Sequence, residues 1–187
     1  MKYSRISTDD IVIALEKAFP KLKIKLDTAN YNEYKTMMNN LTPFLAHYLG
    51  ALSHRSDGHN GTNFVIEGCH FDFDKMLPIL DLYEIKNLKE HFMLIGLVYH
   101  SQTPDELFDN IRKYDTEDEW TYDLNDDELK IRVIAYIEYS RYIYDKFQKY
   151  EPIIYDISNN REYVLDKIVD DIKSNRYISN NCGSSPQ

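Results

Sequence analysis

The chain has 187 residues, of which 43% are hydrophobic and 28% are charged. This composition is not that of a disordered chain and gives one folded domain enough apolar material for its own core. Acidic residues outnumber lysines and arginines by 31 to 22, so the formal net charge is −9. Because phosphates repel an acidic protein, we expect no direct binding to nucleic acids or to anionic membranes. The charge favours a basic protein partner, although it also serves simply to keep a protein soluble.

The cysteine count and the hydropathy of the chain bear on its location. Cys69 and Cys182 are too few for a disulfide-stabilised scaffold. Residues 1–10 carry no apolar signal stretch, and no apolar run approaches the ~20 residues that cross a bilayer. We therefore expect a cytoplasmic protein in a reducing compartment, or one that acts in a host cell if its source is viral.

Apolar residues recur at helical spacing along most of the chain. This periodicity predicts six or seven helices, over residues 7–19, 31–52, 74–83, 85–100, 103–114, 125–150 and 158–174. Pro43 is expected to kink or split the second helix. A minor β element fits residues 21–26, where lysines alternate with apolar residues, or residues 64–73.

Capping residues mark the start of the three last helices. Thr103 with Glu106, and Asn125 with Glu128, have the spacing of a capping box, in which each side chain bonds a free backbone N–H. Ser158 is the expected cap of the final helix. These signals predict an all-α, single-domain bundle over residues 1–174, with no internal repeat, followed by a polar and flexible tail over 175–187.

Histidines and carboxylates between residues 54 and 74 are the candidates for a metal site. The glycine-rich loop carries His54 and His59, and His70 and Asp72 share one face if that segment is extended. Imidazole and carboxylate groups bind zinc and other divalent ions, and such ions support hydrolysis. The alternative interpretation is a polar surface loop beside a buried cysteine, with Asp72 capping the next helix.

An acidic stretch with aromatic residues is the most distinctive feature of the sequence. The candidate partner-binding residues are Asp115, Glu117, Asp118, Glu119, Trp120, Tyr122 and Asp123. An aromatic anchor among carboxylates is a common means of gripping a basic protein surface. The alternative is a solvated connector between two helices, with no partner.

Three functions remain open because no nucleophile elbow, phosphate loop or family motif is present in the sequence. The first is an acidic helical binding or inhibitor protein, of the kind represented by toxin-immunity proteins and viral or phage antagonists. The alternative is a metal-dependent hydrolase that uses the cluster of residues 54–74, in which case zinc or another divalent ion is required; otherwise no cofactor is expected. A further alternative is a structural subunit that assembles through Tyr139, Tyr142 and Tyr144. The sequence leaves the oligomeric state open.

Overall fold

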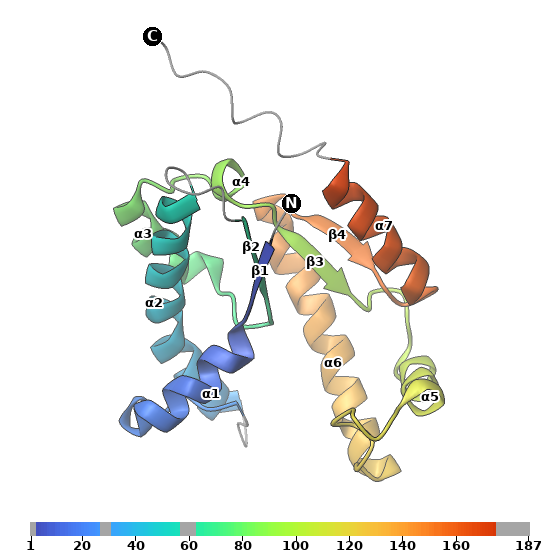
Figure 1. Ribbon diagram of the computed structural model, residues 1–187. Helices are drawn as coiled ribbons and strands as arrows, with labels where there is room; N and C mark the ends of the chain where they lie inside the picture. Colours follow the sequence, from blue (N-terminus) through green and yellow to red (C-terminus); the bar gives the residue numbers. More distant parts are fainter. Residues whose placement is uncertain (1–2, 27–30, 57–62, 175–187) are drawn as a thin grey trace. The chain divides into compact units, whose positions relative to one another are not determined.

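The computed structural model describes residues 3–26, 31–56 and 63–174 (Figure 1). Within these residues the chain forms seven α-helices, three short 3-10 helices and two sheets of two strands each. The mainly α-helical fold class, with a minor β component, is therefore confirmed. Contacts within the chain divide it into two compact units, Met1–Asn87 (unit 1) and Leu88–Gln187 (unit 2).

Unit 1 combines a parallel pair of strands with three α-helices. Its elements in chain order are β1 (Tyr3–Ser7), α1 (Thr8–Ala18), the 3-10 helix η1 (Pro20–Leu22), α2 (Tyr31–Ser56), β2 (Asn63–Glu67), α3 (Phe73–Leu80) and the 3-10 helix η2 (Asp81–Tyr83). β1 and β2 run parallel, with Ser7 opposite Glu67 at their carboxyl ends. Helix α2 packs against α3. The buried core side chains of the three helices include Val12, Met37, Leu41, Leu45, Met76 and Leu80.

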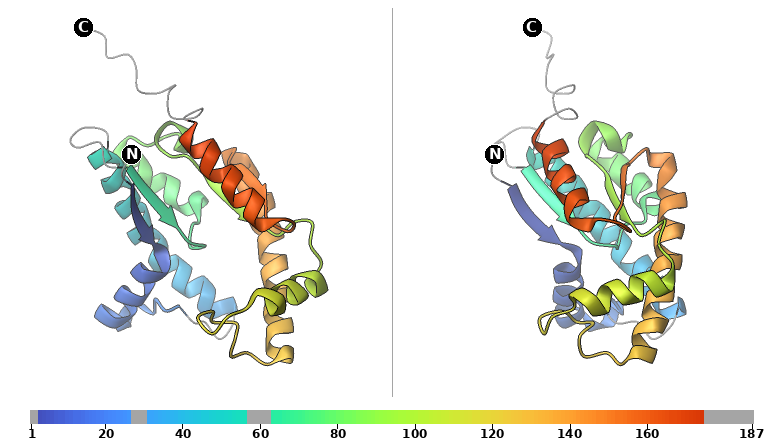
Figure 2. Two further views of the ribbon diagram at one scale, coloured as in Figure 1. Left: turned by 45° about the vertical axis from the view of Figure 1, so that its right-hand side comes forward. Right: turned by 90° about the vertical axis from the view of Figure 1, so that its right-hand side faces the viewer.

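Unit 2 has a second parallel pair of strands and a core of its own. Its elements are α4 (Leu88–His91), β3 (Ile95–Val98), α5 (Pro104–Tyr114), α6 (Asp126–Phe147), the 3-10 helix η3 (Gln148–Tyr150), β4 (Ile153–Asp156) and α7 (Arg161–Lys173). Val98 lies opposite Asp156 at the carboxyl ends of β3 and β4. Leu107 of α5 and Leu129, Val133 and Ile137 of α6 form one buried cluster. Helix α7 lies beside β4 (Figure 2). The Tyr155 hydroxyl of β4 donates a hydrogen bond of 2.7 Å to Asp171 of α7.

Apart from the single-turn α4 and the 3-10 helices, the two units share one order of elements, strand–helix–helix–strand–helix, in which the two strands are parallel. Parallel strands cannot be joined by a tight turn and need a crossover connection, which α1 and α2 supply in unit 1 and α5 and α6 supply in unit 2. We predicted no internal repeat, because the sequence shows none. The repetition is one of backbone topology, and different residues build it.

Residues 85–100 do not form the long helix predicted for them. The segment contains the single turn α4 and then the strand β3, whose residues Ile95–Val98 pair with β4. An apolar run without a clear period fits a buried helix and a strand equally well, and the pairing partner decides between them. The β element offered over 21–26 is also not formed, since η1 and irregular backbone occupy it, whereas β2 lies in the 64–73 segment.

Helix boundaries follow the capping signals at two of three positions. Both capping boxes are present, with Thr103 accepting from the N–H of Glu106 at 3.3 Å and Asn125 accepting from that of Glu128 at 3.0 Å. The last helix instead begins at Arg161, after Asn160 in a left-handed conformation (φ 52°). The tail over 175–187 lies outside the described residues.

Helix α2 is the longest helix, with 26 residues, and it continues through Pro43. The proline therefore does not split it into two helices. Neither α2 nor any other described helix combines the length and the apolar character that a membrane crossing requires.

Candidate protein-binding surface

The predicted partner-binding residues lie on the connection between α5 and α6, residues 115–125, which we call the acidic connection. Three consecutive backbone hydrogen bonds fold it into tight turns, from the N–H of Glu119 to Thr116 O (2.9 Å), of Tyr122 to Glu119 O (3.0 Å) and of Leu124 to Thr121 O (3.2 Å). Because its own backbone groups satisfy one another, the connection holds a defined shape without long strands or helices.

Arg112 fastens the acidic connection to both flanking helices. From α5, its guanidinium donates to the Leu124 carbonyl at 2.6 Å and to the Asp126 carboxylate at 3.0 Å. A third nitrogen lies 3.6 Å from Asp115. The planar fork of an arginine can serve several acceptors at once, so one side chain fixes both ends of the connection.

Asp115 is turned into the connection, with only 6% of its side chain exposed. It accepts a hydrogen bond of 2.6 Å from the Thr121 hydroxyl, and Thr121 is itself buried. Of the seven candidate partner-binding residues, Asp115 therefore stabilises the fold of the connection and does not form part of its exposed surface.

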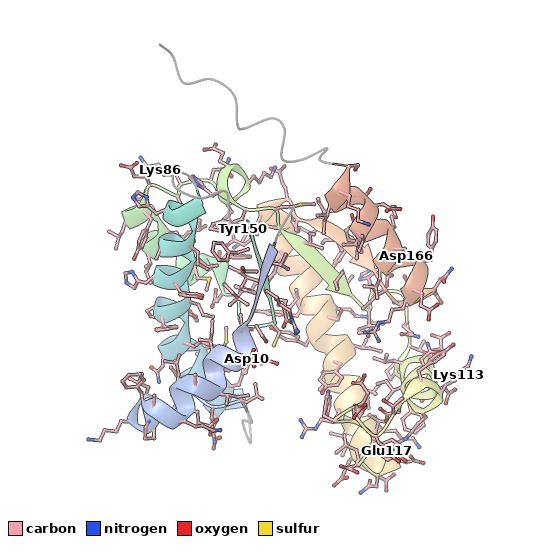
Figure 3. All side chains as sticks on the ribbon, in the orientation of Figure 1. Asp10, Lys86, Lys113, Glu117, Tyr150 and Asp166 are labelled. Atoms are coloured by element: carbon pink, nitrogen blue, oxygen red, sulfur yellow. The ribbon has the colours of Figure 1, made fainter. Side chains whose placement is uncertain are left out.

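The other six candidates are exposed, two of them aromatic and four acidic. Trp120 exposes 56% and Tyr122 exposes 48% of their surface. The exposed carboxylates are those of Glu117, Asp118, Glu119 and Asp123; Glu117 is labelled in Figure 3. Residues 115–123 contain five acidic side chains and no basic one. The connection therefore presents two exposed aromatic side chains in an acidic segment.

Helix α6 holds the Trp120 indole in place. The ring of Tyr136 meets it edge-on with centroids 5.9 Å apart, and the Arg132 guanidinium lies 5.8 Å from the indole ring. A cation near an indole is attracted by the negative face of the ring. Trp120 therefore already accommodates one basic group while more than half of its surface stays accessible.

His70, a candidate metal ligand, is buried in unit 1. Its Nδ1 lies 2.9 Å from the Thr8 hydroxyl and 3.4 Å from the Asp9 carboxylate. Burial lowers the pKa of His70, and the negative charge of Asp9 only partly opposes that shift. The ring is therefore neutral at pH 7 and its Nδ1 is engaged inside the protein.

Gly68 allows residues 68–70 to lie close to Thr8. Its φ of +139° lies in a region that other residues rarely adopt, and a Cβ there would come within 1.7 Å of the Thr8 hydroxyl oxygen. The neighbouring Cys69 thiol lies 3.9 Å from His70 Nε2. Partial desolvation and the negative charge of Asp9 raise the pKa of Cys69, so the thiol is not an activated nucleophile.

The described candidates His54 and Asp72 do not form a metal-binding group with His70. His54 is exposed on α2, and Asp72 forms an ion pair of 2.9 Å with Lys75. His59 lies outside the described residues. Among the residues that the structure does describe, no three histidine, cysteine or acidic side chains are grouped so that they could hold a metal ion. The metal-dependent hydrolase stays a prediction without support from these contacts.

A polar cluster in unit 2 was not predicted. Asp156, at the carboxyl end of β4, accepts hydrogen bonds from the backbone N–H groups of Ser158 (3.0 Å), Ser101 (3.1 Å) and His100 (3.3 Å), and from both serine hydroxyls. Burial alone would raise the pKa of Asp156, but these donors outweigh it and lower the pKa to about 2. No spacing rule reveals this cluster, since 55 residues separate Ser101 from Asp156.

The Asp156 cluster fits a structural clamp better than a catalytic centre. Its carboxylate is already surrounded by donors, and its low pKa makes it a weak base. Its donors come from the loop after β3 and from the loop after β4, so it ties the two strand ends together.

Comparisons of the chain with protein-family models, with curated proteins and with solved structures found no match.

Proposed function

We propose that this chain is an acidic binding protein that engages a basic protein surface through Trp120 and the carboxylates of the acidic connection. The observation that carries the proposal is the 56% exposure of Trp120 on a connection that Arg112 and Asp115 hold in shape. Exposed tryptophans are frequent anchors of protein interfaces, and an ordered surface loses less entropy on binding.

The negative charge around Trp120 selects the kind of partner. Carboxylates around an anchor accelerate association with a basic protein and disfavour acidic partners. A protein of this design neutralises or sequesters its partner by covering a basic surface, for example the nucleic-acid-binding surface of a nuclease. Inhibitors, immunity proteins and viral or phage antagonists belong to this class.

The proposal is tested by affinity purification from the native cell with four forms of the tagged chain. These are the wild type, Trp120→Ala, the double variant Asp118→Lys with Glu119→Lys, and a control in which Asp166 and Asp170 on the exposed face of α7 become Lys. The control changes the net charge by the same amount as the acidic-connection double variant. A basic partner that binds at near-equal amounts to wild type and control, and is lost from the other two variants, supports the proposal.

The purified partner then allows a direct measurement. Trp120 is the only tryptophan in the chain, so its fluorescence reports on the acidic connection alone. We expect its emission to shift to shorter wavelength on binding, and the affinity to fall as salt is added. A partner that binds all four forms equally, or binds without any change in Trp120 emission, would contradict the proposal.

A further inference from the structure

The connection between α1 and α2 in unit 1 has the opposite charge to the acidic connection. Residues 19–26, the described part of this connection, contain three lysines and no acidic residue. Three large apolar side chains in this segment are exposed, Phe19 at 55%, Leu22 at 45% and Leu26 at 40%. We call residues 19–26 the basic connection.

Contacts within unit 1 hold the basic connection in place. Ile24 is buried, with 2% exposure, and Asn40 of α2 donates a hydrogen bond of 2.7 Å to the Leu22 carbonyl. Lys25 forms an ion pair of 2.6 Å with Glu33 at the start of α2. The exposed apolar side chains therefore stand on an ordered segment that does not bury them.

The basic and acidic connections occupy equivalent places in the two units. The basic connection lies between α1 and α2, the two helices that follow β1, and the acidic connection lies between α5 and α6, the two helices that follow β3. Each presents an exposed aromatic side chain, Phe19 in unit 1 and Trp120 in unit 2. Lysines follow Phe19 in the sequence, and carboxylates flank Trp120. Surfaces with apolar anchors and opposite charges are complementary partners.

We propose that the basic surface recognised by the acidic connection is the basic connection of a second copy of this chain. The inference rests on the proposed function of the acidic connection and names its partner. Because the two contacting surfaces differ, the contact is head-to-tail, and each copy keeps one surface open for the next. Copies therefore assemble into chains or closed rings. The net charge of −9 opposes assembly at long range, so the local charges and the apolar anchors stabilise the contact.

Sedimentation velocity of the purified full chain tests the proposal. At low salt we expect the weight-average mass to rise above 22.2 kDa as the concentration increases, and to return to that of the monomer at high salt. The emission of Trp120 should shift to shorter wavelength over the same concentration range. Wild-type protein that stays monomeric at near-millimolar concentration and low salt would overturn the proposal.

Two complementary variants identify the contact. Lys21→Ser with Lys23→Ser removes the basic surface without making it acidic, and Asp118→Lys with Glu119→Lys removes the acidic one. Each variant alone should remain monomeric, whereas an equal mixture should form a heterodimer and nothing larger, because only one intact surface of each kind is left. The control variant with Asp166→Lys and Asp170→Lys should assemble like the wild type, and circular dichroism confirms that all forms are folded.

The outcomes separate this inference from the proposed function. Assembly that persists in both complementary variants, or a mixture that stays monomeric, overturns the head-to-tail contact. If the wild type is monomeric but a different basic protein is captured through the acidic connection, the proposed function stands and the second copy is not its partner.

Discussion

At the scale of single residues, Asp156 shows how one carboxylate can organise a strand end. The loop after β3 and the loop after β4 both direct N–H groups and serine hydroxyls at it. Each such bond to a charged acceptor contributes more than a neutral one. Arg112 has the corresponding role for the acidic connection, where one cation satisfies carbonyl and carboxylate acceptors on both sides. Both side chains fix loops that connect regular elements of unit 2.

The lowered pKa of Asp156 predicts a specific pH dependence of stability. Its pKa is about 2 in the folded protein and 3.8 in an unstructured chain, so the folded state holds its proton less tightly. The stabilisation is fully present above pH ~4 and is lost as the pH falls through ~2. We expect Asp156→Asn to lower the free energy of unfolding by about 1 to 2 kcal/mol at pH 7, a range that allows for its partial exposure.

Urea unfolding from pH 7 to pH 2 checks this prediction. The difference between wild type and Asp156→Asn should shrink toward zero as the pH approaches 2. Asp166→Asn on the exposed face of α7 is the matched control and should change the stability little. A difference that stays constant down to pH 2 would show that the ionised carboxylate is not what stabilises the loop.

At the scale of elements, local signals define the helices more securely than the strands. The helices over 103–114 and 125–150 begin at their predicted caps, because a capping box depends only on residues three positions apart. The strands β3 and β4 depend on pairing between segments that are 58 positions apart, from Ile95 to Ile153. Nothing within residues 85–100 shows that such a partner exists, so a helix was predicted there.

The two capping boxes give a prediction at this scale. Thr103→Ala and Asn125→Ala each remove an acceptor for a backbone N–H of the first turn, and each should lower the free energy of unfolding by ~1 kcal/mol. Ser158 is the predicted cap of the last helix, but that helix begins at Arg161. Ser158→Ala should therefore act through the loss of its bond to Asp156. Urea unfolding at pH 7 and at pH 2 separates the Asn125 and Ser158 variants, since the loss in the Ser158 variant should shrink in acid whereas the loss in the Asn125 variant should persist. Thr103→Ala also loses a hydrogen bond to the Glu106 carboxylate, whose pKa Thr103 lowers, so its loss should shrink in part. Equal losses at both pH values for all three would contradict this assignment.

At the scale of the whole molecule, each unit has its own buried core and its own parallel strand pair. Val12, Leu41 and Met76 lie in unit 1, whereas Leu129 and Val133 lie in unit 2, and all five are fully buried. The single domain predicted over residues 1–174 implies that these cores unfold together. Separate cores allow each unit to lose its structure without the other.

Val133→Ala distinguishes these two behaviours. The side chain has no exposed surface, so its truncation should destabilise the core of unit 2 by about 1 to 3 kcal/mol. We expect hydrogen exchange measured by mass spectrometry to accelerate in the helices α5 and α6 and to stay unchanged in α2 and α3. The reciprocal variant Leu41→Ala should accelerate exchange in unit 1 alone. Accelerated exchange across both units in either variant would indicate one cooperative domain.

The sequence by itself determined the helical class, the two capping boxes and the position of the acidic connection. These features depend on composition, on a period of 3.6 residues or on contacts within a few positions, so they can be recognised locally. Even within the connection, the sequence did not show that Asp115 points inward while Trp120 stays exposed.

Only the tertiary structure decided the parallel strand pairs, the repeated order of elements, the burial of His70 and the donors around Asp156. The contacts that pair the strands, that hold the buried His70 against Thr8 and that bring His100 and Ser101 to Asp156 join residues 55 to 62 positions apart. Bringing such segments together costs chain entropy that only the packing of a whole unit offsets. Because that packing depends on every element at once, no short stretch of the sequence records it.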